Sequence, residues 1–236
     1  ADRLDTLLGI FAIGQLPTGD KDPYALRRAA LGVLRIMIEN KIDLDLQQLL
    51  QLAAQQFDAK LKADKAVGPV MEFIFDRLRA YYQEQGIRPD VLDAVTALKP
   101  ARPVDINKRI HAVSSFRKLP EAESLAAANK RSGNILKKVK GKLPNKIKSS
   151  LLAEEAEQKL FQVLTELTAS VDPLLASSDY EPALQQLARL REPVDTFFDD
   201  VMVMVDDTKL RDNRIALLNQ LHSLFLQVAD ISRLQN

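Results

Sequence analysis

The sequence of 236 residues lacks cysteine and tryptophan and contains only eight glycines and two histidines. Without cysteine there is no disulfide framework, no thiolate zinc site and no cysteine nucleophile. Two histidines, His111 and His222, are too few for a multi-histidine metal centre within this chain. No apolar run approaches the length of a membrane span and no signal peptide is recognisable, so we expect a cytoplasmic protein without a membrane segment. The start at Ala1, inside a predicted helix, leads us to expect a fragment.

Charge is distributed unevenly along the chain, although lysine and arginine number 33 and aspartate and glutamate 32. Between Lys99 and Lys148 there are 14 basic and three acidic residues, a balance of +11, which leaves −10 for the remainder. A basic block in an otherwise acidic chain indicates binding of a polyanion, because counterion release makes phosphate contacts favourable. A solvated, lysine-rich loop explains the same block, and charge alone does not decide between the two.

Apolar residues recur with helical spacing along the whole length, and no stretch alternates convincingly, which predicts an all-α fold. Asp22 and Pro23 have the residue types of an N-cap and a first helical position. The segment 201–205 continues the apolar stripe of the helix before it. Further helices are expected at 46–61, from 68–69 through 81, after 88–89, from 105, from 121, from about 150, after 181–182, after 192–193 and from about 208 to 234.

The prolines of the segment 98–103 cannot both lie inside a helix, so we place a domain boundary there. Residues 1–99 then form one helical domain and residues 100–236 another. Gly32 lies inside an otherwise good helix, where glycine costs up to ~1 kcal/mol relative to alanine. We expect the close approach of a neighbouring helix at that position.

The segment 125–139 separates charge from apolar residues when it is wound as a helix. With ~100° per residue, four cations fall within roughly 60° of Asn134, namely Lys130, Arg131, Lys137 and Lys138. The opposite side carries Leu125, Ala128, Ser132, Ile135, Leu136 and Val139. Lysine and arginine hold phosphates, and asparagine and arginine also read the edges of unpaired RNA bases. A solvated helix face is the alternative, but four cations without an interleaved acid favour nucleic acid.

The residues 138–148 extend this cationic surface as a predicted loop. A second unusual feature is the position of Arg211 and Arg214 in line with the apolar stripe of the last helix. Arginine in such a stripe usually forms a salt bridge, for which the candidate partners are Asp199, Asp206 and Asp207. The alternative is a pair of guanidinium groups beside Asn213 that faces a nucleotide. We favour the structural explanation.

Several blocks of this sequence closely resemble the β subunit of bacterial glycyl-tRNA synthetase. The blocks are Pro17–Ile36, Ala126–Arg131, Asn134–Leu136, Phe197–Asp207 and Val228–Ser232. The resemblance implies the C-terminal third of that subunit. It further implies the end of an HD-like helical domain, followed by a helical-bundle anticodon-binding domain of the type shared with arginyl-tRNA synthetase.

In that family the catalytic centre, with ATP and magnesium, belongs to a separate α subunit, and the β subunit supplies most tRNA contacts. The resemblance therefore implies glycine tRNA and the α subunit as partners, with no catalytic residue, cofactor or metal in this fragment. By position, the residues that match the family's motif are Asn129, Lys130, Arg131, Asn134, Arg211, Asn213 and Arg214. Lys137, Lys138 and Arg109 of the basic block complete the set of tRNA-binding candidates.

Two other interpretations remain open at this stage. A helical scaffold that recruits proteins through the acidic N-terminal half does not need the one-sided cations. A vestigial HD hydrolase would use Asp2 or Asp5, but the histidine and histidine–aspartate ligands that must precede them are missing. The cluster Asp199, Asp200, Asp206 and Asp207 lacks the regularly spaced oxygen ligands of a cation loop.

Overall fold

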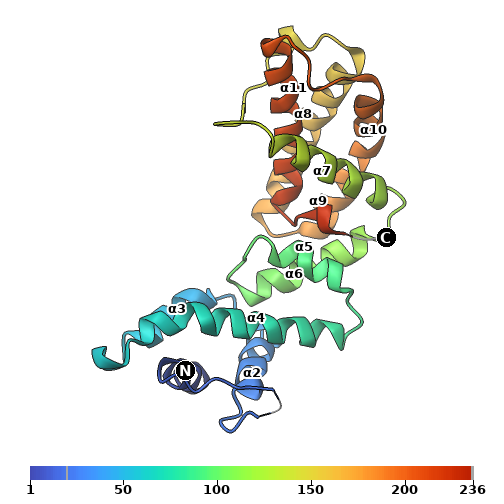
Figure 1. The fold of residues 1–236 in the computed structure, drawn as a ribbon. Helices are drawn as coiled ribbons and strands as arrows, with labels where there is room; N and C mark the ends of the chain where they lie inside the picture. Colours follow the sequence, from blue (N-terminus) through green and yellow to red (C-terminus); the bar gives the residue numbers. More distant parts are fainter. Residues whose placement is uncertain (20, 235–236) are drawn as a thin grey trace. The chain divides into compact units, whose positions relative to one another are not determined.

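The computed structural model describes residues 1–19 and 21–234, and every regular element within them is a helix (Figure 1). The predicted all-α fold is therefore confirmed. Thr18 and Lys21 form an isolated bridge, and no strand occurs in the described residues. None of the helices described is both long and apolar enough to cross a membrane. The contacts divide the chain into two compact units.

The first unit comprises residues 1–92 and 99–107. Its elements are α1 (Asp2–Ala12), α2 (Leu26–Glu39), α3 (Leu46–Ala54) and α4 (Val67–Gln83), with 3-10 turns at Ala59–Leu61 and Ala63–Ala66. Helix α4 packs against α1, α2 and α3. Leu7, Leu34 and Ile74 are fully buried between them, and the rings of Phe11 and Phe73 lie 5.2 Å apart. The predicted apolar stripes thus face one core.

The start of α2 differs from the prediction. The helix begins at Leu26, and Pro23 lies in the turn before it. Asp22 nevertheless caps the helix from a distance, because its carboxylate accepts hydrogen bonds from the backbone N–H groups of Leu26 (2.7 Å) and Arg27 (3.0 Å). The next predicted helix is also shorter than expected, since α3 ends at Ala54.

Gly32 meets a neighbouring helix through a single side chain. A Cβ atom at this position would lie 1.8 Å from Nη1 of Arg3, which projects from α1. The expected close approach is therefore present, but the approaching group is the end of a long, exposed side chain and not the backbone of the other helix.

Two proline-initiated helices connect the units. Helices α5 (Pro89–Thr96) and α6 (Pro103–Phe116) both begin with a proline, at the position where its missing N–H has no helical partner. The contacts assign 93–98 to the second unit and 99–107 to the first. The predicted domain boundary between residues 99 and 100 therefore lies in the region where short segments of the chain belong alternately to the two units. The division into functional domains stays a prediction.

The second unit contains α7 (Ala122–Leu136), α8 (Glu155–Ala176), α9 (Tyr180–Leu187), α10 (Arg191–Asp200) and α11 (Thr208–Leu226), with 3-10 turns at Ser149–Leu151, Ala188–Leu190 and Ile231–Arg233. Helix α8 packs on α9, α10 and α11, and α7 packs on α10, α11 and the last turn. Figure 1 shows α7 running crosswise to α8 and α11. Leu164, Phe197 and Phe225 are fully buried in this core.

The predicted helical continuation through residues 201–205 is wrong. Helix α10 ends at Asp200, and the chain is irregular from there to the start of α11. Val201 and Val203 are buried, whereas Met202 and Met204 are 73% and 53% exposed. Alternate side chains therefore point to opposite sides, as in an extended segment. The last helix is likewise shorter than predicted and ends at Leu226, before the 3-10 turn.

Candidate nucleic-acid interface

Helix α7 has the two faces that the sequence predicts. Leu125, Ala128, Ser132 and Leu136 are buried against the rest of the second unit. The hydroxyl of Ser132 donates to the carbonyl of Ala128 (2.8 Å), so this polar group is satisfied within the helix. The exposed side carries Lys130, Arg131 and Asn134 on the helix, and Lys137 and Lys138 just after it.

The exposed cations of α7 and of the loop that follows form what we call the basic surface. It consists of Lys130, Arg131, Lys137, Lys138, Lys140, Lys142, Lys146 and Lys148. In the described residues, no ion pair with an acidic side chain is formed by any of them. Exposed cations without carboxylate partners remain available for phosphate groups.

Asn129, one of the predicted tRNA ligands, lies on the packed side of α7 and is buried. Its Oδ1 lies 2.8 Å from Nδ1 of His222 on α11, so the histidine Nδ1–H donates to the amide oxygen. Burial lowers the pKa of His222, an effect that nearby Lys137 strengthens and Asp230 opposes. This pair joins α7 to α11.

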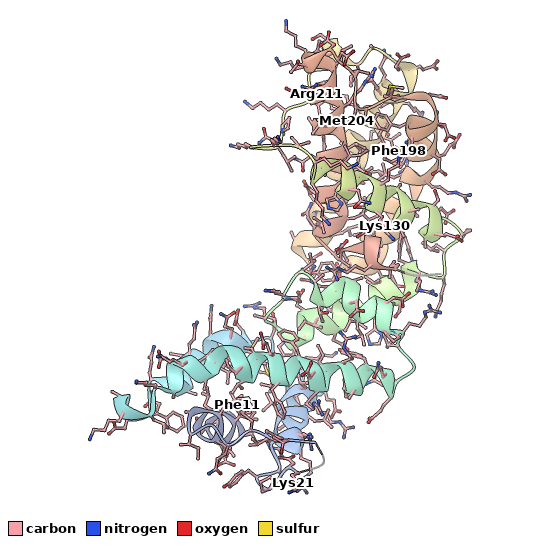
Figure 2. All side chains as sticks on the ribbon, viewed as in Figure 1. Phe11, Lys21, Lys130, Phe198, Met204 and Arg211 are labelled. Carbon is pink, nitrogen blue, oxygen red and sulfur yellow. The ribbon has the colours of Figure 1, made fainter. Side chains whose placement is uncertain are left out.

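Arg131 stacks on an aromatic side chain. Its guanidinium carbon lies 4.3 Å from the centroid of the Phe198 ring at the end of α10. That ring is half-buried and meets the fully buried ring of Phe197 edge-on, with centroids 5.6 Å apart. Lys130 and Phe198 are both labelled in Figure 2. The aromatic contact holds Arg131 in place and was not predicted from the sequence.

Arg214 is buried in an ion pair, as we favoured, but with other partners than those predicted. Its Nε lies 2.7 Å from Oε1 of the fully buried Glu157 on α8, and Glu154 lies 3.9 Å away. Its Nη1 also donates to the carbonyl of Met202 (2.8 Å). Arg214 therefore fixes the segment 201–205 to the helical core.

The aspartates that the sequence suggests as partners of Arg211 and Arg214 do not pair with them in the described residues. The carboxylate of Asp207 caps α11 by accepting from the N–H groups of Lys209 (2.8 Å) and Leu210 (3.1 Å). Among the residues that the structure describes, the one hydrogen-bond partner of Arg211 is the carbonyl of Val205, at 3.5 Å. Asp199, Asp200 and Asp206 are exposed.

Asparagines of α11 hold in place the loop that follows α7, residues 138–148, which we call the basic loop. The buried amide of Asn213 accepts from the N–H of Lys148 (2.7 Å) and donates to its carbonyl (3.2 Å). Farther along α11, Asn219 donates to the carbonyl of Pro144 (3.2 Å). Asn213 thus positions cations and does not itself face solvent. Sequence reasoning missed Asn219, because its partner is 75 residues away.

Arg109 is engaged at the other end of α11. Its Nη1 donates to the carbonyls of Gln227 (2.6 Å) and Val228 (2.8 Å), where the helix ends. Its Nη2 donates to the hydroxyl of Tyr180, and the guanidinium also lies over that ring. The structure therefore gathers Lys130, Arg131, Asn134, Lys137 and Lys138, and places Arg109, Asn129, Asn213 and Arg214 in contacts within the protein.

Comparison with known proteins classifies both parts of the chain. Residues 125–231 match the family model described as the DALR anticodon binding domain, so the second unit contains an anticodon-binding domain of this class. Residues 1–97 match the model described as the glycyl-tRNA synthetase beta subunit. The chain belongs to the glycyl-tRNA synthetase β-subunit family.

The similarity to named glycine–tRNA ligase β subunits extends over the whole chain. The glycine–tRNA ligase β subunits of Aeromonas salmonicida strain A449 and Shewanella oneidensis strain MR-1 are each 56% identical over 235 residues, which is 100% of this chain. That of Pseudomonas aeruginosa strain PAO1 is 56% identical over 234 residues, or 99% of the chain. The chain spans 34% of the length of each of these relatives.

Proposed function

We propose that the second unit binds the anticodon arm of glycine tRNA through the basic surface. In the complete β subunit it would hold the tRNA for aminoacylation at an active site on the α subunit. ATP and magnesium would be bound there, and this part of the β chain would contribute no catalytic group. The protein would act in the cytoplasm, where tRNA is charged.

The observation that carries this proposal is the one-sided, unpaired charge of α7. Lys130 is exposed on the helix and Lys137 and Lys138 are exposed just after it, and the described structure gives them no acidic partner. A scaffold for proteins has no need of such a surface. Binding of a phosphate backbone requires such a surface, because each neutralised phosphate releases a condensed counterion.

The attachment of the basic loop to α11 supports the same function. Asn213 and Asn219 hold its backbone at Lys148 and Pro144. The backbone of an anchored loop keeps its lysines near the cations of α7, which lowers the entropic cost of binding an extended phosphate backbone.

The test compares two pairs of lysine substitutions in this chain. The variant Lys130→Ala/Lys137→Ala removes two cations of the basic surface, and Lys60→Ala/Lys65→Ala removes two exposed cations of the first unit as a matched control. Fluorescence anisotropy with labelled glycine tRNA over a salt series measures affinity and its salt dependence. We expect the first variant alone to bind more weakly, with a slope reduced by roughly 0.7–0.9 per lost phosphate contact.

Circular dichroism establishes that each variant is folded. Equal loss of affinity in both variants would point to a diffuse charge effect and contradict a site on α7. An unchanged affinity and slope in folded Lys130→Ala/Lys137→Ala would refute the assignment. If the unsubstituted chain bound no tRNA, a scaffolding role would become the better explanation.

A further inference from the structure

Next to the basic surface, the second unit presents apolar and aromatic groups that no function assigned so far uses. The Phe198 ring is held edge-on against the buried Phe197, and the exposed guanidinium of Arg131 covers it at 4.3 Å. The guanidinium group is planar and weakly hydrated, so its outer face can stack on another flat group. In the described residues Arg131 has no carboxylate partner that would compete for it.

The segment after Phe198 displays two methionines in a fixed backbone. Met202 and Met204 are mostly exposed, whereas Val201 and Val203 anchor the segment in the core. The carbonyl of Met202 is bound by the buried Arg214. The backbone that exposes these large apolar side chains is fixed by a buried ion pair, so their exposure does not result from a flexible loop. Polarizable thioethers on such a surface adapt to flat, apolar ligands.

Chain connectivity keeps these groups close together. Met202 follows Phe198 by four residues, so their Cα atoms lie within about 15 Å at most. Figure 2 labels Phe198, Met204 and Lys130 in this unit. The segment from Phe198 to Met204 therefore carries an aromatic ring that a guanidinium covers and, within six residues of it, two exposed thioethers.

The surrounding charges select which part of a nucleotide could bind here. Asp199, Asp200 and Asp206 are exposed on either side of the methionines and would repel phosphate. Lys130, Lys137 and Lys138 attract it. A nucleic acid that lays its backbone on the lysines would therefore present bases to the apolar groups, and the unpaired bases of a loop are free to turn outward.

We propose that Arg131, Phe198, Met202 and Met204 form a stacking platform for unpaired bases of the tRNA anticodon loop. This inference rests on the proposed function, because it requires that the basic surface hold the anticodon arm. The bases stack on the outer face of Arg131 and against the methionines, and the lysines hold the neighbouring phosphates.

The experiment uses substitutions that leave charge unchanged. Arg131→Lys keeps the charge but removes the flat guanidinium, and Met202→Ser/Met204→Ser removes exposed thioethers. Phe198→Leu removes the ring beneath. The matched controls are Arg189→Lys and Leu52→Ser, which alter an exposed arginine and an exposed leucine elsewhere. The probes are labelled glycine tRNA and a version of it with a different anticodon.

We expect Arg131→Lys and Met202→Ser/Met204→Ser each to weaken binding of the authentic tRNA about tenfold, a typical loss for one base stack. The salt slope should stay unchanged, in contrast to the lysine variants. Phe198→Leu should behave alike, and the methionine variant remains decisive if Phe198→Leu fails to fold.

Wild-type affinity in the folded Arg131→Lys and methionine variants would overturn the platform and leave the proposed function intact. Absence of tRNA binding by the unsubstituted chain would overturn the proposed function, and the platform with it.

Discussion

Asn213 and Lys148 are paired like residues of two neighbouring strands, although one partner is a side chain. The amide of Asn213 accepts from the N–H of Lys148 at 2.7 Å and donates to its carbonyl at 3.2 Å. The side chain of Asn213 is buried, whereas Lys148 is exposed, so both bonds are shielded from water on the side of α11. This contact attaches the end of the basic loop to α11.

The variant Asn213→Ala should therefore loosen the loop. A buried backbone group without its partner costs about 1–3 kcal/mol, and we expect a loss of stability in that range. Amide exchange at Lys148 should become faster, and tRNA affinity should fall because the loop must be ordered on binding. Asn145→Ala, at an exposed position in the same loop, is the control. Unchanged exchange at Lys148 would show that the amide does not hold the loop.

Glu157→Gln tests the buried ion pair with Arg214. The substitution keeps the shape of the side chain but leaves the arginine charge without its nearest partner in the core. Breaking one side of a buried pair costs about 3–5 kcal/mol, against about 0–1 kcal/mol for an exposed pair. Asp43→Asn, which breaks the exposed pair with Arg102, is the matched control.

Urea unfolding of both variants gives the comparison. The difference between them should be several kcal/mol, with similar dependence on urea concentration. Equal and small losses would mean that Glu154, at 3.9 Å from Arg214, takes over the charge. Such a result would reduce Glu157 to a partner in helix capping, where it accepts from the N–H of Glu154.

Local periodicity predicted most helices, because each must present an apolar stripe to the core. It failed at 201–205, where all five residues are apolar and therefore fit a helical stripe and an extended segment equally well. The decision there is tertiary: the carbonyl of Met202 is bound by Arg214, whose position depends on Glu157 in another helix. A sequence pattern contains no information on that partner.

The candidate site was predictable to a similar extent. The exposed cations of α7 followed from helical geometry, since their spacing places them opposite the packed stripe. Asn129 and Asn213 were predicted as tRNA ligands, and the structure instead joins them to His222 and Lys148. A polar residue near a basic cluster has the same local signature whether it binds a ligand or an internal group 65 or 93 residues away.

Gly32→Ala should show how much the contact with Arg3 matters. Alanine favours a helix by about 1 kcal/mol over glycine, but its Cβ would displace the arginine guanidinium. We expect a stabilisation close to that value in an Arg3→Ala background and a smaller one in the original chain. Thermal or urea unfolding of the four variants in a double-mutant cycle measures the difference. A strong destabilisation in both backgrounds would reveal a closer helix contact than the structure shows.

His222 should make the second unit sensitive to pH. Burial lowers its pKa in the folded state, so the unfolded chain binds the proton more tightly. The stability that its neutral form contributes is complete above the ordinary histidine pKa of 6.5 and is lost as the pH falls below it toward the folded pKa. The Nδ1–H bond to Asn129 persists on protonation, whereas the desolvation cost appears only then.

Unfolding free energies measured between about pH 7.5 and pH 5, a range that brackets the ordinary histidine pKa, give the test. Stability should decline toward acid, and His222→Gln should flatten that part of the profile, because glutamine is polar but does not titrate. A profile of equal slope in the variant would assign the acid sensitivity to carboxylates. If stability instead rose toward pH 5, the attraction of Asp230 would outweigh burial and hold the histidine in its charged form.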